Sequence, residues 1–172
     1  WGGYAESVAV PAANAHQIPP GIDFAVASVV MRHAPTALNL LQTKAGLREG
    51  ESVLVMGASG GLGSTGVQLA KLTGAMVIAG AGSTDRVDAA VRLGADHGIA
   101  YQESSLAEGV ALATDGRGVD VVFDNVGDPS LWPDVVASMA RGARFVTAGA
   151  HAGGYVELDL HRLYRQRLRF IG

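Results

Sequence analysis

The chain has 172 residues, 48% hydrophobic and 17% charged, so it has enough apolar surface for one folded domain and too little charge for disorder. Its formal net charge of -3 argues against a protein that coats nucleic acid, and the lack of cysteine excludes disulfides, thiolate zinc sites and a cysteine nucleophile within this sequence. No run of transmembrane length and no signal peptide are evident, so we expect a cytoplasmic protein with no membrane or nucleic-acid partner.

The first residues indicate a short strand followed by a connector. Residues 7–10 alternate in polarity, and several prolines punctuate the stretch after them. From Asp23 the composition becomes apolar, and we expect a helix that begins near Pro35 and ends at Gly46. Because the sequence begins at Trp1 and not at methionine, we expect it to be a piece of a longer protein.

A glycine-rich turn follows, in the sequence SVLVMGASGGLGSTGVQLAK from Ser52 to Lys71. Val53 to Met56 predict a strand, and apolar residues recur at helical spacing from Leu62. Such a turn lets the backbone approach a phosphate, because the first N–H groups of the helix are free and face the anion. A tight turn also needs glycine for steric reasons alone, so the turn by itself leaves a dinucleotide site and simple packing equally open.

The rest of the chain alternates strands with helices. We expect strands at 76–79, 98–100, 119–123, 144–148 and 168–171, with helices at 84–93, 130–141 and 159–166. With the first strand, these make two sets of three. This pattern predicts an α/β fold, a doubly wound Rossmann domain with a six-stranded parallel sheet.

Ligands of doubly wound sheets bind beyond the carboxyl ends of the strands, where the strand order reverses. The candidate ligand positions are therefore 57–62, 80–83, Tyr101, 125–127 and 148–150. Their convergence at one edge favours a dinucleotide site over packing alone.

Four motifs, GASGGLGSTGVQLAK, LGADHGIAY, GVDVVFDNVG and RGARFVTAGA, resemble in order and separation the cofactor domain of the medium-chain dehydrogenase/reductase superfamily. Within it the chain is most similar to zinc-independent quinone oxidoreductases and their enoyl-reductase relatives. The resemblance implies that residues 1–22 are the last strand and connector of a catalytic domain and that residues 23–172 form the Rossmann domain. Most of the catalytic domain then lies outside this chain, which alone is expected to be inactive.

The register of the glycine turn assigns its parts. Aligned from the end of the strand, the three fingerprint positions are Ala58, Gly60 and Gly63. Gly60 is then the point of close approach to a pyrophosphate, and Gly63 is the contact between helix and sheet. By resemblance, alanine in the first position is common among NADP-dependent members. Gly66 is expected to serve packing.

The end of the second strand indicates which nicotinamide cofactor binds. NAD sites place an acidic residue there to accept hydrogen bonds from the ribose, and residues 77–80 contain none. Ser83 and Arg86 follow, and by resemblance Arg86 and Tyr101 stand where these reductases contact a 2′-phosphate. We therefore expect NADPH. Surface roles for Arg86 and Tyr101 remain alternatives, and Asp85 could contact a ribose or cap its helix.

The other expected cofactor contacts lie in the glycine turn and at later strand ends. They are Ser59, Gly61, Leu62, Asn125, Val126, Gly149 and Ala150. By resemblance, Thr36 approaches the nicotinamide, although it could equally cap or pack its own helix. No residue is a convincing acid or base, so the catalytic residues stay unassigned.

No metal site is expected, because the five histidines form no i,i+4 pair and no cysteine is present. By resemblance, Arg32 stands where zinc-dependent alcohol dehydrogenases carry a cysteine ligand. The preferred function is an NADPH-dependent reduction of quinone-like or other α,β-unsaturated carbonyl substrates. A zinc-dependent alcohol dehydrogenase and a non-enzymatic nucleotide-sensing module are the alternatives. We also expect a homodimer through the last strand, 168–171, at the sheet edge.

Overall fold

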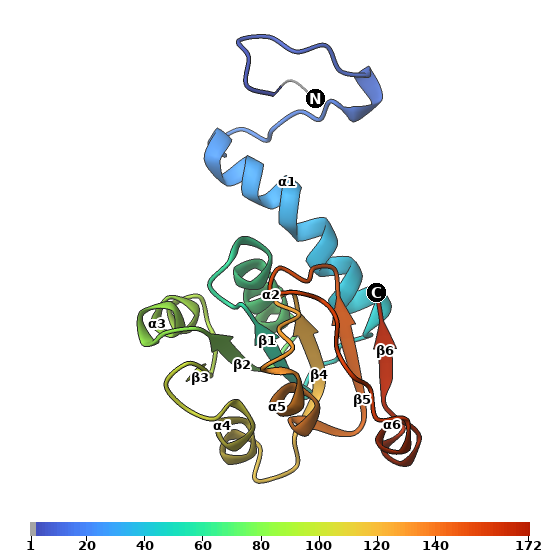
Figure 1. Ribbon diagram of the computed structural model, residues 1–172. Coiled ribbons are helices and arrows are strands. Elements are labelled where there is room, and N and C mark those ends of the chain that lie inside the picture. Colours follow the sequence, from blue (N-terminus) through green and yellow to red (C-terminus); the bar gives the residue numbers. More distant parts are fainter. Residues whose placement is uncertain (1–2) are drawn as a thin grey trace.

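The computed structural model describes residues 3–172 as a parallel sheet between two layers of helices, with an N-terminal arm that projects away from it (Figure 1). The strands are β1 (Ser52–Met56), β2 (Met76–Ala81), β3 (His97–Ala100), β4 (Val119–Asp124), β5 (Met139–Thr147) and β6 (Arg169–Ile171). Their order across the sheet is β3-β2-β1-β4-β5-β6. The prediction of a doubly wound, six-stranded parallel sheet is confirmed, and the order reverses between β1 and β4.

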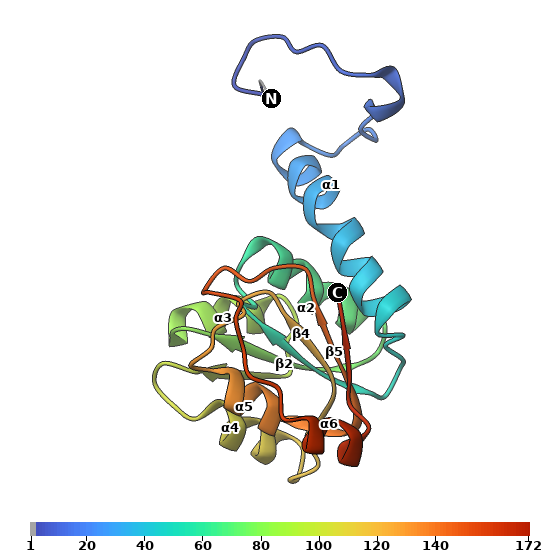
Figure 2. The ribbon, with the colours of Figure 1, turned by 45° about the vertical axis from the view of Figure 1, so that its right-hand side comes forward.

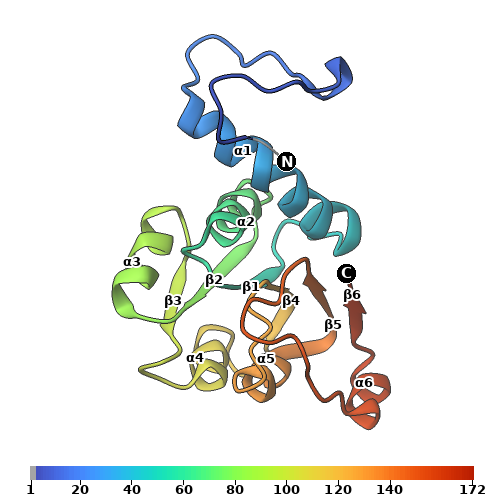
Figure 3. The ribbon, with the colours of Figure 1, turned by 45° about the horizontal axis from the view of Figure 1, so that its top comes forward.

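Helices cover both faces of the sheet (Figure 3). One face is covered by the π-helical η2 (Asn39–Lys44), α2 (Gly61–Leu72) and α3 (Thr84–Arg92), and α1 (Phe24–Leu38) packs against α2. The other is covered by α4 (Leu106–Ala113), α5 (Trp132–Ala137) and α6 (Leu160–Gln166).

Each central strand contributes alternate residues to two cores. Val53 and Val55 of β1 belong to the core under α2, whereas Leu54 and Met56 belong to the core under α4 and α5. All four side chains are buried, because a parallel strand between two helical layers has no solvent face. The sequence therefore reads as a continuous apolar run, and the strand ends become the first places where polar groups can reach solvent.

The helix before β1 begins earlier than predicted. Asp23 caps α1, its carboxylate accepting a hydrogen bond from the Val26 N–H at 2.8 Å. Pro35 lies inside the last turn of α1, so the prediction that a helix begins there is wrong. The chain continues into the π-helical η2, where the Ala45 N–H donates to the Leu40 carbonyl. Gly46, with φ +60°, ends the helix as predicted.

Together α1 and η2 form one long apolar helix. Phe24–Lys44 spans 21 residues and, by length and composition, is apolar enough to cross a membrane. The prediction that no run reaches this length is wrong. In its C-terminal part Ala37, Leu40 and Leu41 are buried in the protein core, whereas only 22% of the apolar window is buried in the structure.

The N-terminal arm lacks its expected strand. Within residues 3–22, the structure describes one 3-10 turn, Ala12–Asn14, and an otherwise irregular chain that leads to α1 (Figure 2). Val8 and Val10 are more than half exposed, since no strand lies beside them to pair with. The predicted strand at 7–10 is therefore wrong for this chain. Conversely, α4 was not predicted, although it covers β3 and β2.

Candidate functional site

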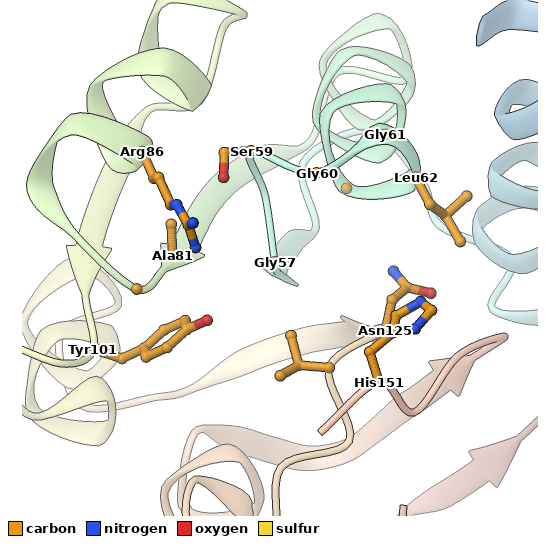
Figure 4. Close-up of a pocket in the computed structure, with 13 residues that line it drawn as sticks. Gly57, Ser59, Gly60, Gly61, Leu62, Ala81, Arg86, Tyr101, Asn125 and His151 are labelled. Atoms are coloured by element: carbon orange, nitrogen blue, oxygen red, sulfur yellow. The ribbon is translucent and has the colours of Figure 1, made fainter. Parts of the chain in front are cut away.

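A cavity of about 480 Å³ opens beyond the carboxyl ends of the strands, where the strand order reverses (Figure 4). Segments that follow β1, β2, β3, β4 and β5 all contribute to its wall. Eight of the residues predicted to contact a cofactor line it: Ser59, Gly60, Gly61, Leu62, Arg86, Tyr101, Asn125 and Val126. The structure thus brings together side chains that lie as far apart in sequence as 59 and 126.

The turn after β1 is shaped by close backbone contacts. Gly57 has φ +66°, and its carbonyl accepts a hydrogen bond from the Gly60 N–H at 2.9 Å. A Cβ placed on Gly63 would lie 2.1 Å from that same carbonyl oxygen. Gly63 is therefore glycine because the first turn of α2 passes directly against the end of β1, in agreement with its predicted packing role.

Two further glycines bring helices close to their neighbours. A Cβ on Gly66 would approach the Phe123 ring of β4 to 2.9 Å, so Gly66 serves packing as predicted. A Cβ on Gly61 would meet the His33 ring of α1 at 2.5 Å, which makes Gly61 also a helix-to-helix contact. Ala58 is completely buried and does not line the cavity.

The N-terminus of α2 provides a place for an anion. Gly60 is the N-cap, and the next N–H groups, of Gly61, Leu62 and Gly63, precede the first residue that completes the helical ladder. All four residues line the cavity. No acidic side chain stands in the first turn of this helix. The free donors and the positive end of the helix dipole suit a pyrophosphate.

At the β2 side the cavity wall has one positive charge and no carboxylate among its lining residues. Ala81 and Gly82 end the strand without a polar side chain, and Arg86 of α3 is exposed beside them. Figure 4 shows the Arg86 guanidinium directed into the space above Tyr101. Burial raises the pKa of Tyr101, while Arg86 acts in the opposite direction. These groups suit an anionic ligand.

Five predicted contacts do not line the cavity, namely Thr36, Ala58, Ser83, Gly149 and Ala150. Thr36 lies half-buried on α1. Ser83 occupies the N-cap of α3, but its hydroxyl makes no capping hydrogen bond. Gly149 is partly exposed and Ala150 is exposed, and a Cβ on Gly127 would meet Ala150 at 2.9 Å.

Asn125 carries an unpaired amide at the end of β4. Its side chain is 8% exposed, and neither its oxygen nor its nitrogen has a hydrogen-bond partner in the described part of the chain. A buried polar group without a partner costs about 1 to 3 kcal/mol. Because Asn125 lines the cavity, a ligand with a donor and an acceptor could satisfy it.

His151 also lines the cavity, although no sequence pattern singled it out. The loops after β4 and β5 are joined by hydrogen bonds from the Ala152 N–H to the Val126 carbonyl and from the Gly154 N–H to the Gly127 carbonyl. This pairing places the His151 ring beside Asn125 (Figure 4). Only its position directly after the strand end at 148–150 could have indicated it.

The described residues do not supply a zinc site. No group of three or more histidine, aspartate or glutamate side chains among residues 3–172 is arranged to hold a metal ion, and the sequence has no cysteine. Arg32, which stands where a zinc ligand was considered, is exposed on α1. The groups that line the cavity therefore suit a dinucleotide, and within residues 3–172 no cluster of metal ligands stands beside them.

The sequence profile of the zinc-binding dehydrogenase family matches residues 61–172. A 2-haloacrylate reductase from Burkholderia is 31% identical over 91% of this chain and 47% of its own length. The lovastatin diketide synthase lovF of Aspergillus terreus is 34% identical over 86% of this chain and 6% of its own length. The chain thus spans about half of the single reductase and a small part of the synthase.

Solved structures of a dehydrogenase and an oxidoreductase also match this chain over about half of their own length. An NAD-dependent alcohol dehydrogenase superimposes with a TM-score of 0.89 at 34% identity, covering 99% of this chain and 50% of its own. The quinone oxidoreductase of Escherichia coli, solved with NADPH, gives a TM-score of 0.81 at 28% identity, covering 89% of this chain and 47% of its own. One of these two proteins is thus named as NAD-dependent, and the other was solved with NADPH.

Proposed function

The chain belongs to the zinc-binding dehydrogenase family, in the medium-chain dehydrogenase/reductase superfamily, and on that premise we propose that it is the NADPH-binding part of a zinc-independent reductase of quinone-like or other α,β-unsaturated carbonyl compounds. The haloacrylate reductase, the alcohol dehydrogenase and the quinone oxidoreductase that this chain resembles are all named as oxidoreductases. The names of two of them include haloacrylate and quinone, and both compounds have a C=C bond conjugated with a carbonyl group.

The observation that carries the choice of NADPH is the charge of the cavity wall at the end of β2. No lining residue is acidic, and Arg86 is the lining residue with a full positive charge. NAD-selective sites need a carboxylate at this position to accept hydrogen bonds from the ribose, whereas a 2′-phosphate needs a cation. Arg86 supplies the cation, and Tyr101 supplies a hydroxyl below it.

The chain's other lining groups have roles at the rest of the cofactor. The N–H groups of Gly61, Leu62 and Gly63 bind the pyrophosphate, with the positive end of α2 behind them. The unpaired amide of Asn125 matches a carboxamide, because each supplies one donor group and one acceptor. When bound, NADPH supplies the hydride, while these residues fix where its nicotinamide lies.

Titration of the chain with NADPH and NADH tests this proposal. We expect Arg86→Ala to weaken NADPH binding by about 10- to 100-fold, the value of a charge-assisted hydrogen bond, and to leave NADH nearly unchanged. Arg92→Ala is the matched control, since Arg92 is an exposed arginine in the last turn of the same helix. Equal losses for the two cofactors in Arg86→Ala would sink the assignment.

An alcohol dehydrogenase that uses NAD is the second candidate, because the structure of an NAD-dependent alcohol dehydrogenase superimposes over 99% of this chain. This alternative predicts tighter NADH than NADPH binding in the wild-type titration. Zinc analysis of the protein expressed from its whole gene decides the metal question, because the described residues of this chain form no zinc site.

We also propose that the protein forms a homodimer through β6. The strand lies at the edge of the sheet, paired with β5 on one side, so its outer backbone groups can accept a second copy's β6. Sedimentation of the chain at tens of micromolar tests this. A monomer only, with no edge pairing in a crystal, contradicts it.

A further inference from the structure

A carboxylate outside the cavity wall is hydrogen-bonded to the first turn of α3, the helix that carries Arg86. Glu103, in the loop after β3, bonds through its two carboxylate oxygens to the first residue of α3. Oε1 accepts from the Thr84 N–H at 3.1 Å, and Oε2 accepts from the Thr84 hydroxyl at 2.8 Å. The turn that presents Glu103 is itself fixed, because the Glu103 N–H donates to the Ala100 carbonyl.

This contact places a negative charge on the same helical turn as Arg86. Thr84 is the first residue of α3 and Arg86 is the third, so both belong to the turn that follows the end of β2. Tyr101, which lies below Arg86, is two residues from Glu103 in the loop. Glu103 therefore accepts the hydrogen bond of the Thr84 N–H, and its negative charge offsets the positive end of the α3 dipole. Both the N–H and the dipole would otherwise help Arg86 to bind an anion.

We propose that Glu103 is a specificity-determining residue that disfavours NADPH relative to NADH. Its carboxylate occupies the Thr84 N–H at the start of α3, and its negative charge repels the 2′-phosphate. This inference rests on the proposed function, in which Arg86 contacts that phosphate. Arg86 and Glu103 then act in opposite directions on one group. The chain binds both cofactors, with a smaller preference for NADPH than Arg86 alone would give.

The charge of Glu103 is present throughout the neutral range. The hydrogen bonds from the Thr84 hydroxyl and N–H lower the pKa of its carboxyl group, so it remains ionised at every pH at which cofactor binding would be measured. Glu103 is also exposed, so salt screens its repulsion, with a Debye length of about 10 Å at 0.1 M. The effect is therefore modest and depends on ionic strength.

The test compares NADPH and NADH dissociation constants for the wild-type chain and Glu103→Gln at low ionic strength. We expect the NADPH constant to fall about 2- to 5-fold, the size of one exposed charge interaction, with NADH within about 2-fold. Glu108→Gln is the matched control, since Glu108 is an exposed glutamate on α4 outside the cavity wall. The difference between the variants should shrink in added salt.

Two results would overturn the inference: an unchanged ratio of the two constants in Glu103→Gln, or a shift toward NADH. Retained NADH binding shows that the variant is folded. Failure of the proposed function looks different, because the wild-type chain would then bind neither dinucleotide, or Arg86→Ala would leave NADPH binding intact. If Arg86→Ala loses NADPH while Glu103→Gln keeps the wild-type ratio, only the role of Glu103 is wrong.

Discussion

Two polar side chains at opposite ends of the parallel sheet differ in their hydrogen bonding. At the amino ends of β1 and β4, Asp120 accepts hydrogen bonds from the Ser52 N–H at 2.8 Å and from the Arg117 guanidinium at 2.6 Å. At the carboxyl end of β4, the Asn125 amide has no partner in the described part of the chain. The hydrogen-bonded carboxylate of Asp120, at what we call the paired end, stabilises the fold. The Asn125 amide, at the open end, lacks hydrogen-bond partners that a ligand can supply.

The amino end also contains the most buried ion pair. Arg144 of β5 is 8% exposed, and its guanidinium contacts the Glu51 carboxylate at 2.6 Å just before β1. The same guanidinium reaches the backbone carbonyls of Gly46 and Asp120. Arg144 therefore ties β5, β4 and the approach to β1 together. Substitutions at this end should cost stability, whereas substitutions at the other end should cost cofactor binding.

The largest expected loss of stability is an exception to this division, because it comes from a residue at the ligand end. Gly63→Ala adds a Cβ 2.1 Å from the Gly57 carbonyl, a backbone atom that cannot rotate away. We expect a loss of about 3 kcal/mol or more in the free energy of unfolding, measured by urea denaturation, although Gly63 lies at the ligand end. Gly60→Ala is the comparison, because its Cβ would lie 3.3 Å from the same oxygen. Gly60→Ala should fold normally and bind NADPH more weakly; equal stability losses would contradict this view.

Gly63 shows how far sequence reasoning reached. The doubly wound sheet of six parallel strands and the packing role of this glycine follow from apolar runs and one turn register, because buried parallel strands leave a strong pattern. Helix α4 was missed although Ser105 and Glu108 are a Ser-x-x-Glu start signal, and the Ser105 hydroxyl does cap the helix, accepting from the Glu108 N–H.

Other errors concern features that local sequence does not determine. Pro35 is typical of a helix start, but the helix tolerates it in its last turn and continues in π form. Residues 7–10 alternate like a strand, yet no partner strand lies beside them. Glu103 reaches Thr84 only because the loop after β3 folds over α3, a contact between residues 19 positions apart.

The second largest loss of stability is expected at the amino end of the sheet, at Arg144. Arg144→Met leaves Glu51 half of its hydrogen bonds and removes the tie to β4, so we expect a loss of about 2 to 3 kcal/mol of unfolding free energy. Cofactor binding should stay within about 2-fold of wild type. Arg165→Met is the control, because Arg165 is an exposed arginine in the last turn of α6. A marked loss of NADPH binding in Arg144→Met would erase the division between the two ends.

A smaller effect at the same end depends on pH. Although burial opposes it, the hydrogen bonds from Arg117 and Ser52 lower the pKa of Asp120 to about 2 from 3.8. A depressed pKa stabilises the folded state above about pH 4, and this contribution is lost as the pH falls toward 2. After allowance for solvent screening, we expect Asp120→Asn to cost about 1 to 2 kcal/mol at pH 7.

The pH profile of unfolding separates this contribution from general acid instability. The stability difference between wild type and Asp120→Asn should shrink between about pH 4 and pH 2, because Asp120 takes up its proton as the pH falls to its folded-state pKa. Asp115→Asn, at an exposed turn position with φ +50°, should show no such convergence. A difference that is constant with pH would mean that Asp120 acts through its shape and not its charge.

The smallest stability effect is expected at the ligand end, and it has the opposite sign. Asn125→Leu removes an amide whose burial is uncompensated, so the unfolding free energy should be unchanged or rise by up to about 1 kcal/mol. NADPH and NADH should both bind about 3- to 10-fold more weakly, the value of one hydrogen bond, because a nicotinamide carboxamide is common to them. Asn39→Leu, at an exposed position, should change neither measurement. If Asn125→Leu were instead as destabilising as Arg144→Met, then the amide would be a structural group, and the contrast between a paired end and an open end would fail.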